Sequence, residues 1–105
     1  MSALDIEVTV GSVRALPVPA GTAALTVVSA GCWYYGCTFQ ESTGAATATV
    51  TITSGGNFVD AFQLAQSDVQ SHWFGPMGIR VDAGITVTVT SGSADGAVFA
   101  GYEKP

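Results

Sequence analysis

The stretch ATATVTIT, residues 46–53, decides the fold class, because small or branched apolar residues alternate with threonines along its whole length. The stretch ITVTVT, residues 85–90, repeats the pattern. Successive side chains of a strand point to opposite faces, so each stretch has one apolar face for a core and one threonine face. β-Branched side chains also suit a pleated surface. Both stretches are therefore predicted to be strands covered on one side.

Turn-forming residues separate further short apolar runs at intervals of about eight to twelve positions, which is typical of a β-sandwich or barrel. Helix is expected only as one or two turns over residues 66–72, with Ser67 as the cap. The pattern predicts an all-β, single-domain antiparallel β-sandwich over residues 1–105, with seven or eight short strands. A jelly roll is favoured over an immunoglobulin-like sandwich, because it holds eight strands in two Greek keys. The other predicted strands are residues 4–10, 23–29, 32–40, 58–65, 77–81 and 97–102.

The chain is poor in charge: 10% of its residues are charged, against about 25% in an ordinary globular domain. Such a surface protects a small monomer badly against self-association, so we expect a homo-oligomer, with a threonine-covered monomer as the alternative. The formal net charge is −5, and the basic residues are Arg14, Arg80 and Lys104. Nucleic-acid binding needs clustered Lys and Arg, so the composition excludes it.

The compartment expected from the sequence is a reducing cytoplasm, since the first residues lack a signal-peptide pattern and no apolar run is long enough to span a membrane. Cys32 and Cys37 are therefore expected to be free thiols. Their odd spacing would place them on opposite faces of one continuous strand. Only a tight turn at Tyr35-Gly36 would bring them together.

No residue pattern points to catalysis or to a bound cofactor. His72 is the single histidine, and no nucleophile motif surrounds it. Cys32, Cys37 and His72 supply at most three zinc ligands and have no zinc-site spacing. We therefore expect no enzyme activity, no cofactor and no metal site.

Three consecutive aromatic residues, Trp33, Tyr34 and Tyr35, carry the main binding hypothesis. Side chains alternate along a strand, so at least one of these rings is expected to point outward unless the strand is buried on both faces. Exposed Trp and Tyr are typical anchors of interfaces, and they also stack on sugars. A subunit interface is favoured over a sugar site.

The stretch WFGPMGIRVDAGITV, residues 73–87, resembles a pattern in small proteins from the structural gene clusters of tailed phages. In that group a Phe-Gly-Pro turn leads into a short strand, a Gly turn and a Thr/Val-rich strand. The ending GSADGAVFAGY, residues 92–102, is similar as well, whereas the rest of the chain matches only in strand rhythm. The resemblance implies a virion component, commonly a capsid decoration or minor head protein, which often forms β-rich trimers and has no catalytic residues.

The expected function is therefore a decoration (cement) protein that is made in the host cytoplasm and binds the capsid surface. Its expected partners are further copies of itself, as a trimer, and the major capsid protein, with no nucleic acid and no membrane. A tail- or fibre-associated glycan-binding module is the alternative. Residues 1–6 are a candidate assembly arm. The candidate interface residues are Leu4, Ile6, Trp33, Tyr34, Tyr35, Trp73 and Phe74.

Overall fold

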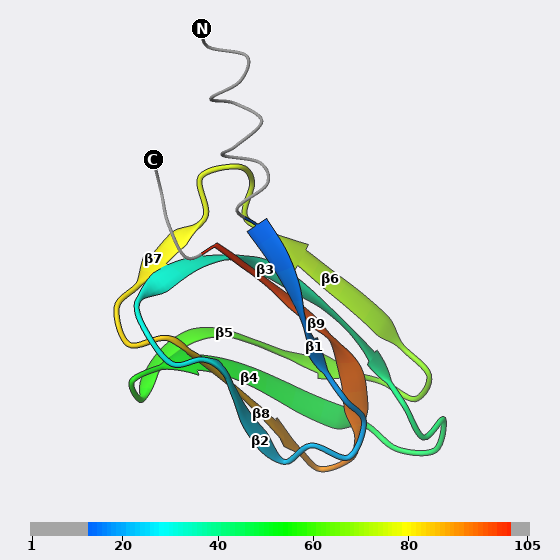
Figure 1. Cartoon of the computed structure of the whole chain (residues 1–105). Helices are drawn as coiled ribbons and strands as arrows, with labels where there is room; N and C mark the ends of the chain where they lie inside the picture. The colour runs from blue at the N-terminus through cyan, green and yellow to red at the C-terminus, as the bar shows by residue number, and fades with distance from the viewer. Residues whose placement is uncertain (1–12, 102–105) are drawn as a thin grey trace, which may run out of the picture.

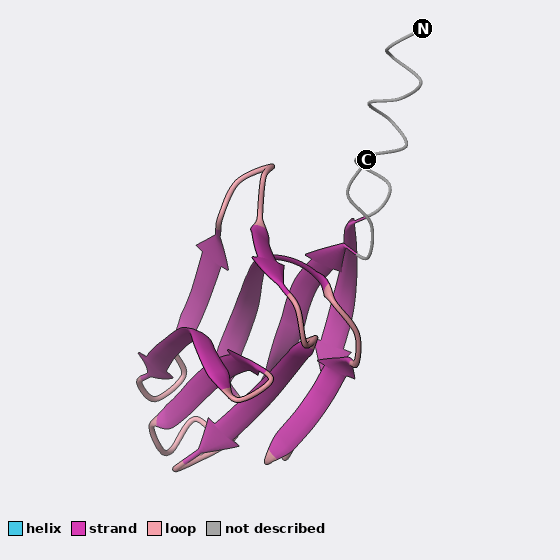
Figure 2. Cartoon of the chain, turned by 90° about the vertical axis from the view of Figure 1, so that its left-hand side faces the viewer, coloured by secondary structure: helices cyan, strands magenta, loops and turns pink. Residues whose placement is uncertain are grey.

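The computed structural model describes residues 13–101, and this range contains nine β-strands and no helix. The strands form two antiparallel sheets that face each other as the layers of a sandwich (Figure 1, Figure 2). The predicted all-β sandwich is confirmed. The strand predicted at residues 4–10 and the candidate arm at residues 1–6 lie outside the described residues. The strands are β1 (Val13–Val18), β2 (Ala24–Val28), β3 (Cys32–Glu41), β4 (Ala48–Ser54), β5 (Asn57–Leu64), β6 (Val69–Trp73), β7 (Ile79–Val81), β8 (Ile85–Thr90) and β9 (Ala94–Gly101).

The strand pairs are nested along the chain: β1 pairs with β9, β2 with β8, β3 with β6, and β4 with β5. This nesting is that of a long two-stranded ribbon folded over on itself. The resulting strand orders are β1-β9-β3-β6 in the first sheet and β2-β8-β4-β5 in the second. Eight strands in this arrangement form a jelly roll. The ninth, three-residue strand β7 pairs with the first residues of β3.

The core lies between the sheets and is built by the alternation that the sequence shows. On β4 the side chains of Ala48, Val50 and Ile52 are fully buried, and on β8 those of Ile85 and Val87 are fully buried. Burying one such Val or Ile side chain stabilises the fold by about 1.5–3 kcal/mol. The threonines between them lie on the outer face of the second sheet, in cross-strand pairs Thr49–Thr90, Thr51–Thr88 and Thr53–Thr86.

Two strands differ from the sequence prediction. The helix predicted over residues 66–72 is wrong: Ser67 has a φ of 59°, which no right-handed helix accepts, and β6 begins at Val69. The ladder to β3 supplies the backbone hydrogen bonds that a helix would otherwise have to provide. The strand β1 was not predicted, because Pro17 interrupts the strand pattern. Proline is nevertheless tolerated in a strand at the edge of a sheet, where β1 lies.

A β-bulge at Tyr35 changes which face the second half of β3 presents. Tyr34 pairs with Ala100 and Gly36 with Phe99, so Tyr35 has no partner on β9. The extra residue shifts the alternation by one position. Cys32 and Cys37 consequently both lie in the core, fully buried and unbridged. Their predicted placement on opposite faces is wrong, because it assumed an uninterrupted strand, whereas the prediction of free thiols is confirmed.

Candidate functional site

The candidate interface residues occupy different environments in the structure. Trp73 is 61% exposed and Phe74 is 41% exposed. Trp33 is half-buried, and Tyr34 and Tyr35 are buried. Leu4 and Ile6 lie outside the described residues. Trp33 is the most exposed of the rings at residues 33–35, whereas Tyr34 faces the core together with Cys32 and the bulged Tyr35 packs against Trp73.

Trp73 is the last residue of β6, an edge strand of the first sheet, and it belongs to a group of rings. It stacks on Tyr35 with the ring centres 6.1 Å apart, and its edge meets Phe99 at 6.4 Å. Next to this group, the Arg80 guanidinium lies 6.0 Å from the centre of the Trp33 ring. Cation–π and aromatic pairs of this kind are each worth about 0.5–1.5 kcal/mol beyond the burial of area. Trp73 is therefore held in place on one side and open to a partner on the other.

The exposed large apolar side chains of the described range all fall within residues 58–79, on β5, β6, β7 and the loop between β6 and β7. Phe58 and Ile79 line one pocket, and Trp73 and Phe74 adjoin each other at the end of β6, whereas Val69 lies at the other end of that strand. Exposed apolar side chains that lie near one another mark an interaction surface, whereas single ones are ordinary. We call this set the apolar edge. It consists of Phe58, Val69, Trp73, Phe74, Met77 and Ile79, of which Phe58 and Met77 are the most exposed at 70% and 71%.

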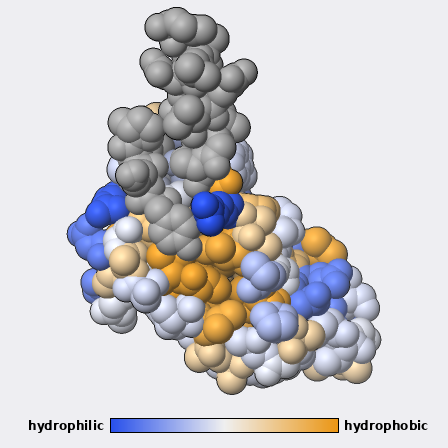
Figure 3. Space-filling model, in the orientation of Figure 1, coloured by the Kyte–Doolittle hydropathy of each residue, from blue (hydrophilic) through white to orange (hydrophobic). Residues whose placement is uncertain are grey.

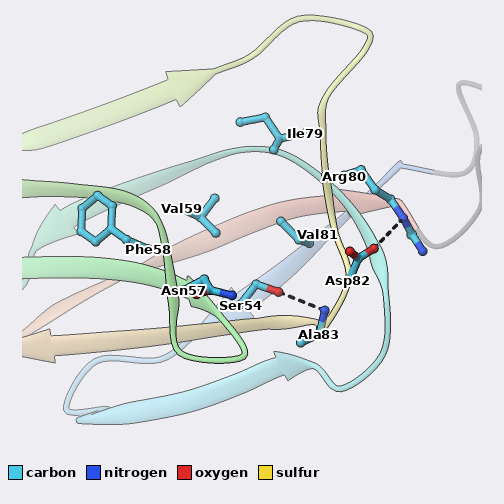
Figure 4. A pocket seen from close by; sticks show the side chains of 9 residues that line it. All are labelled: Ser54, Asn57, Phe58, Val59, Ile79, Arg80, Val81, Asp82 and Ala83. Carbon is cyan, nitrogen blue, oxygen red and sulfur yellow. Dashed lines mark hydrogen bonds and ion pairs between the residues drawn. The ribbon is translucent and has the colours of Figure 1, made fainter.

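A pocket of about 340 Å³ opens between the β4–β5 hairpin and β7 (Figure 4). Its apolar wall includes Phe58 and Ile79 from the apolar edge, and Figure 4 shows Arg80 and Asp82 together at its far end. The Arg80 Nε lies 3.5 Å from Asp82 Oδ1, and the Ala83 amide donates a hydrogen bond to Ser54 Oγ. The pocket is lined by Ser54, Asn57, Phe58, Val59, Ile79, Arg80, Val81, Asp82 and Ala83.

A second apolar surface lies on another side of the sandwich. Figure 3 shows apolar side chains gathered in the middle of the molecule, over the opening between the two sheets. β1 and β2 are edge strands of the two sheets. Leu16, Leu25 and Val27 on these strands are only partly buried where they pack against the core. Among residues 13–101, the core is therefore only partly covered along β1 and β2.

A polar cluster joins the two sheets at the edge where β5 and β6 approach each other. Asp60 on β5 accepts a hydrogen bond at Oδ2 from the Tyr34 hydroxyl, at 3.0 Å, and His72 Nδ1 lies 2.8 Å from the same oxygen. The Phe62 ring packs on the His72 ring at 4.6 Å. Three ligand atoms, one each from Cys37, Asp60 and His72, lie within 4.8 Å of one another. The cluster leaves no signal in the sequence, since spacings of 23 and 12 residues match no motif and only the strand pairing brings the three residues together.

The cluster has the residue types of a Cys-His-Asp nucleophilic site, but the state of the thiol argues against that chemistry. Burial, helped by the Asp60 carboxylate and opposed by hydrogen bonding to Tyr34, raises the pKa of Cys37 to about 11. A thiol with this pKa is protonated at neutral pH and is a poor nucleophile. The Cys37 side chain is also fully buried, so a substrate has no access to its sulfur.

Fold and surfaces together define the chain as a jelly-roll module with an aromatic, apolar edge. Comparison with protein-family models, curated proteins and solved structures yields no match for this chain. Within residues 13–101 the structure contains no helix with the length and apolarity needed to cross a membrane.

Proposed function

We propose that the chain is a structural subunit that docks on a large protein assembly, as a decoration protein on the outer surface of a tailed-phage head. The observation that carries the proposal is the apolar edge, which leaves six large apolar side chains exposed in a chain with 10% charged residues. Such a surface promotes association with protein. The resemblance of residues 73–87, which include four of the six residues of this edge, supports the phage assignment.

Such a subunit stabilises the shell by binding neighbouring capsid proteins and performs no chemical reaction. Covering one Phe or Trp side chain contributes about 1.5–3 kcal/mol, and exposed aromatic anchors dominate the binding energy of interfaces. A subunit that contacts two neighbouring capsid proteins therefore resists their separation under internal pressure. The proposed self-association into trimers, through the apolar edge or through the open side at β1 and β2, covers the remaining apolar surface.

The test is an association measurement on matched variants. Trp73→Gln removes the ring from the apolar edge, whereas Thr90→Gln changes an exposed residue of the second sheet and serves as the control. Light scattering of the wild type is expected to give a trimer mass. In co-sedimentation with heads of the phage that encodes the chain, wild type and Thr90→Gln bind, and Trp73→Gln binds at least tenfold more weakly. A wild type that stays monomeric and unbound overturns the proposal.

A glycan-binding module is the second candidate, because the pocket beside Phe58 combines a ring with the polar side chains of Asn57, Arg80 and Asp82. Sugars bind where an aromatic face and a few placed polar groups converge. Glycan-array binding by the wild type that is lost in Asn57→Ala and retained in Trp73→Gln supports this candidate over the first. An array without signal, together with binding to heads, supports the decoration protein.

A further inference from the structure

We propose that Cys37, Asp60 and His72 form a binding site for a thiophilic divalent cation, with Zn²⁺ as the best fit. Their three ligand atoms lie within 4.8 Å of one another, and each residue comes from a different strand. The expectation of no metal site considered only the two cysteines and the histidine, and did not include Asp60. This proposal does not depend on the docking function, because the three residues lie between the two sheets and are not part of the apolar edge.

The donor set fits zinc better than it fits a hard cation. Zinc in proteins is bound by thiolate, imidazole and carboxylate, whereas Ca²⁺ and Mg²⁺ require mainly oxygen ligands. Binding of the ion would therefore displace the Cys37 thiol proton into solvent. Metal–ligand bonds of about 2.0–2.3 Å in a tetrahedron place the ligand atoms roughly 3.3–3.8 Å apart. The separations of up to 4.8 Å would then have to shrink by about 1 Å, and the 2.8 Å between His72 Nδ1 and Asp60 Oδ2 would have to grow by about 0.5 Å. Three protein ligands leave the fourth position to water.

The surroundings also suit a metal site. The Tyr34 hydroxyl donates to Asp60 Oδ2, which orients the carboxylate in the way that hydrogen bonds from outside the ligand set orient metal ligands. The side chains of His72 and Asp60 are 28% and 11% exposed, so an ion has a path to the site, while Cys37 closes its inner end. The short contact between His72 and Asp60 shows that the two side chains already converge.

The position of the site gives the ion a structural role. Cys37 and His72 are direct cross-strand partners on β3 and β6 of the first sheet, and Asp60 lies on β5, the edge strand of the second. A bound ion would therefore cross-link the two sheets at an open edge of the sandwich. Any ligand that binds only the folded state stabilises it, so zinc in hundredfold excess over its Kd is expected to raise the Tm by roughly 10 °C.

Cobalt titration of the full chain tests the proposal, because Co²⁺ occupies zinc sites and a cysteine ligand produces an intense thiolate-to-cobalt absorption band. The wild type is expected to show this band with a stoichiometry of one cobalt per chain, and Zn²⁺ is expected to abolish it. Cys37→Ser should lose the band. Cys32→Ser is the matched control, since Cys32 is an equally buried thiol of the same strand outside the cluster, and it should keep the band.

A folded wild type that shows no band with Co²⁺ and no Tm rise with Zn²⁺ overturns the proposal, as does loss of the band in Cys32→Ser with retention in Cys37→Ser. If Cys37→Ser does not fold, His72→Gln decides the question, because this partly exposed edge residue tolerates substitution better. An affinity for Zn²⁺ at least tenfold lower in His72→Gln, measured by chelator competition, supports the site. An unchanged affinity refutes it.

Discussion

The Tyr34 hydroxyl on β3 donates a 3.0 Å hydrogen bond to Asp60 Oδ2 on β5, and this bond spans the two sheets of the sandwich. Most of the contact between the sheets is apolar. A polar pair buried there is stable only when both its donor and its acceptor are hydrogen-bonded. Burial raises the pKa of Tyr34, so its hydroxyl stays a donor at all ordinary pH values. The pair fixes the position of the edge strand β5.

Tyr34→Phe is expected to lower the free energy of unfolding by about 2 kcal/mol, because it removes a buried hydrogen bond to a carboxylate. Asp60→Ala, which removes the acceptor oxygen, should lower it by at least as much. In the double variant, the loss should fall short of the sum of the two single losses by about 1 kcal/mol, since both remove the same bond. Urea unfolding of the four proteins measures this coupling. Strict additivity would show that the bond does not form in solution.

Gly36→Ala is expected to destabilise the protein by more than about 3 kcal/mol or to prevent folding. Gly36 has a φ of 142°, and an added Cβ would lie 2.0 Å from the His72 carbonyl oxygen. Gly56→Ala is the control, because Gly56 also has a positive φ, of 84°, but faces open space. It should lose only about 1 kcal/mol. Equal losses of stability in the two variants would show that β6 does not lie against Gly36 in solution.

Glu41 predicts a loss of stability in acid. Its carboxylate accepts hydrogen bonds from the Ser67 amide and from Thr43 and Gly44, and these bonds lower its pKa to about 2. The folded state therefore holds this proton less tightly than the unfolded state, in which a Glu titrates near pH 4.3. The stabilisation is fully present above this pH and is lost as the pH falls towards 2.

Urea midpoints at several pH values check this prediction with Glu41→Gln as the reference. The variant should be less stable than the wild type at pH 7, and the difference between the two should shrink between about pH 4.3 and 2. A difference that stays constant over this range would exclude the carboxylate as its source.

Both thiols are expected to resist modification in the folded protein. Cys32 and Cys37 are fully buried, and burial raises the pKa of each, although the Arg80 charge opposes the rise at Cys32. At pH 8, a thiol reagent should therefore react with both cysteines in denaturant, and much more slowly with each of them in the native state. Since the folded state holds the Cys37 proton more tightly, stability should also fall as the pH rises from about 9 to 11.

The strands that the sequence predicted best are β4 and β8, because one buried face and one threonine face produce a period of two that no helix would show. The prediction failed where a strand lacks this contrast. β6 alternates Gln70 and His72 with Val69, Ser71 and Trp73, so two polar side chains are partly buried while the large apolar Val69 and Trp73 are exposed. Its strand character comes from pairing with β3, which is a long-range contact.

The candidate sites were predictable only in part. Trp73 and Phe74 were named from the sequence, and the structure exposes both. Phe58 was not among the candidates named from the sequence. Strict alternation along residues 58–65 would place it on the same face as Phe62, but the bulge between Ile52 and Thr53 in the β4–β5 pairing breaks that register.

The sequence by itself determined the all-β class, the threonine-covered outer face of the second sheet and the low surface charge, since each depends on composition or on neighbours two positions apart. Tertiary structure alone decided that Cys37, Asp60 and His72 meet, that both cysteines face the core and that Phe58 and Ile79 line the same pocket. These properties depend on the register between strands far apart in the chain, and a single inserted residue such as Tyr35 reverses every side chain beyond it.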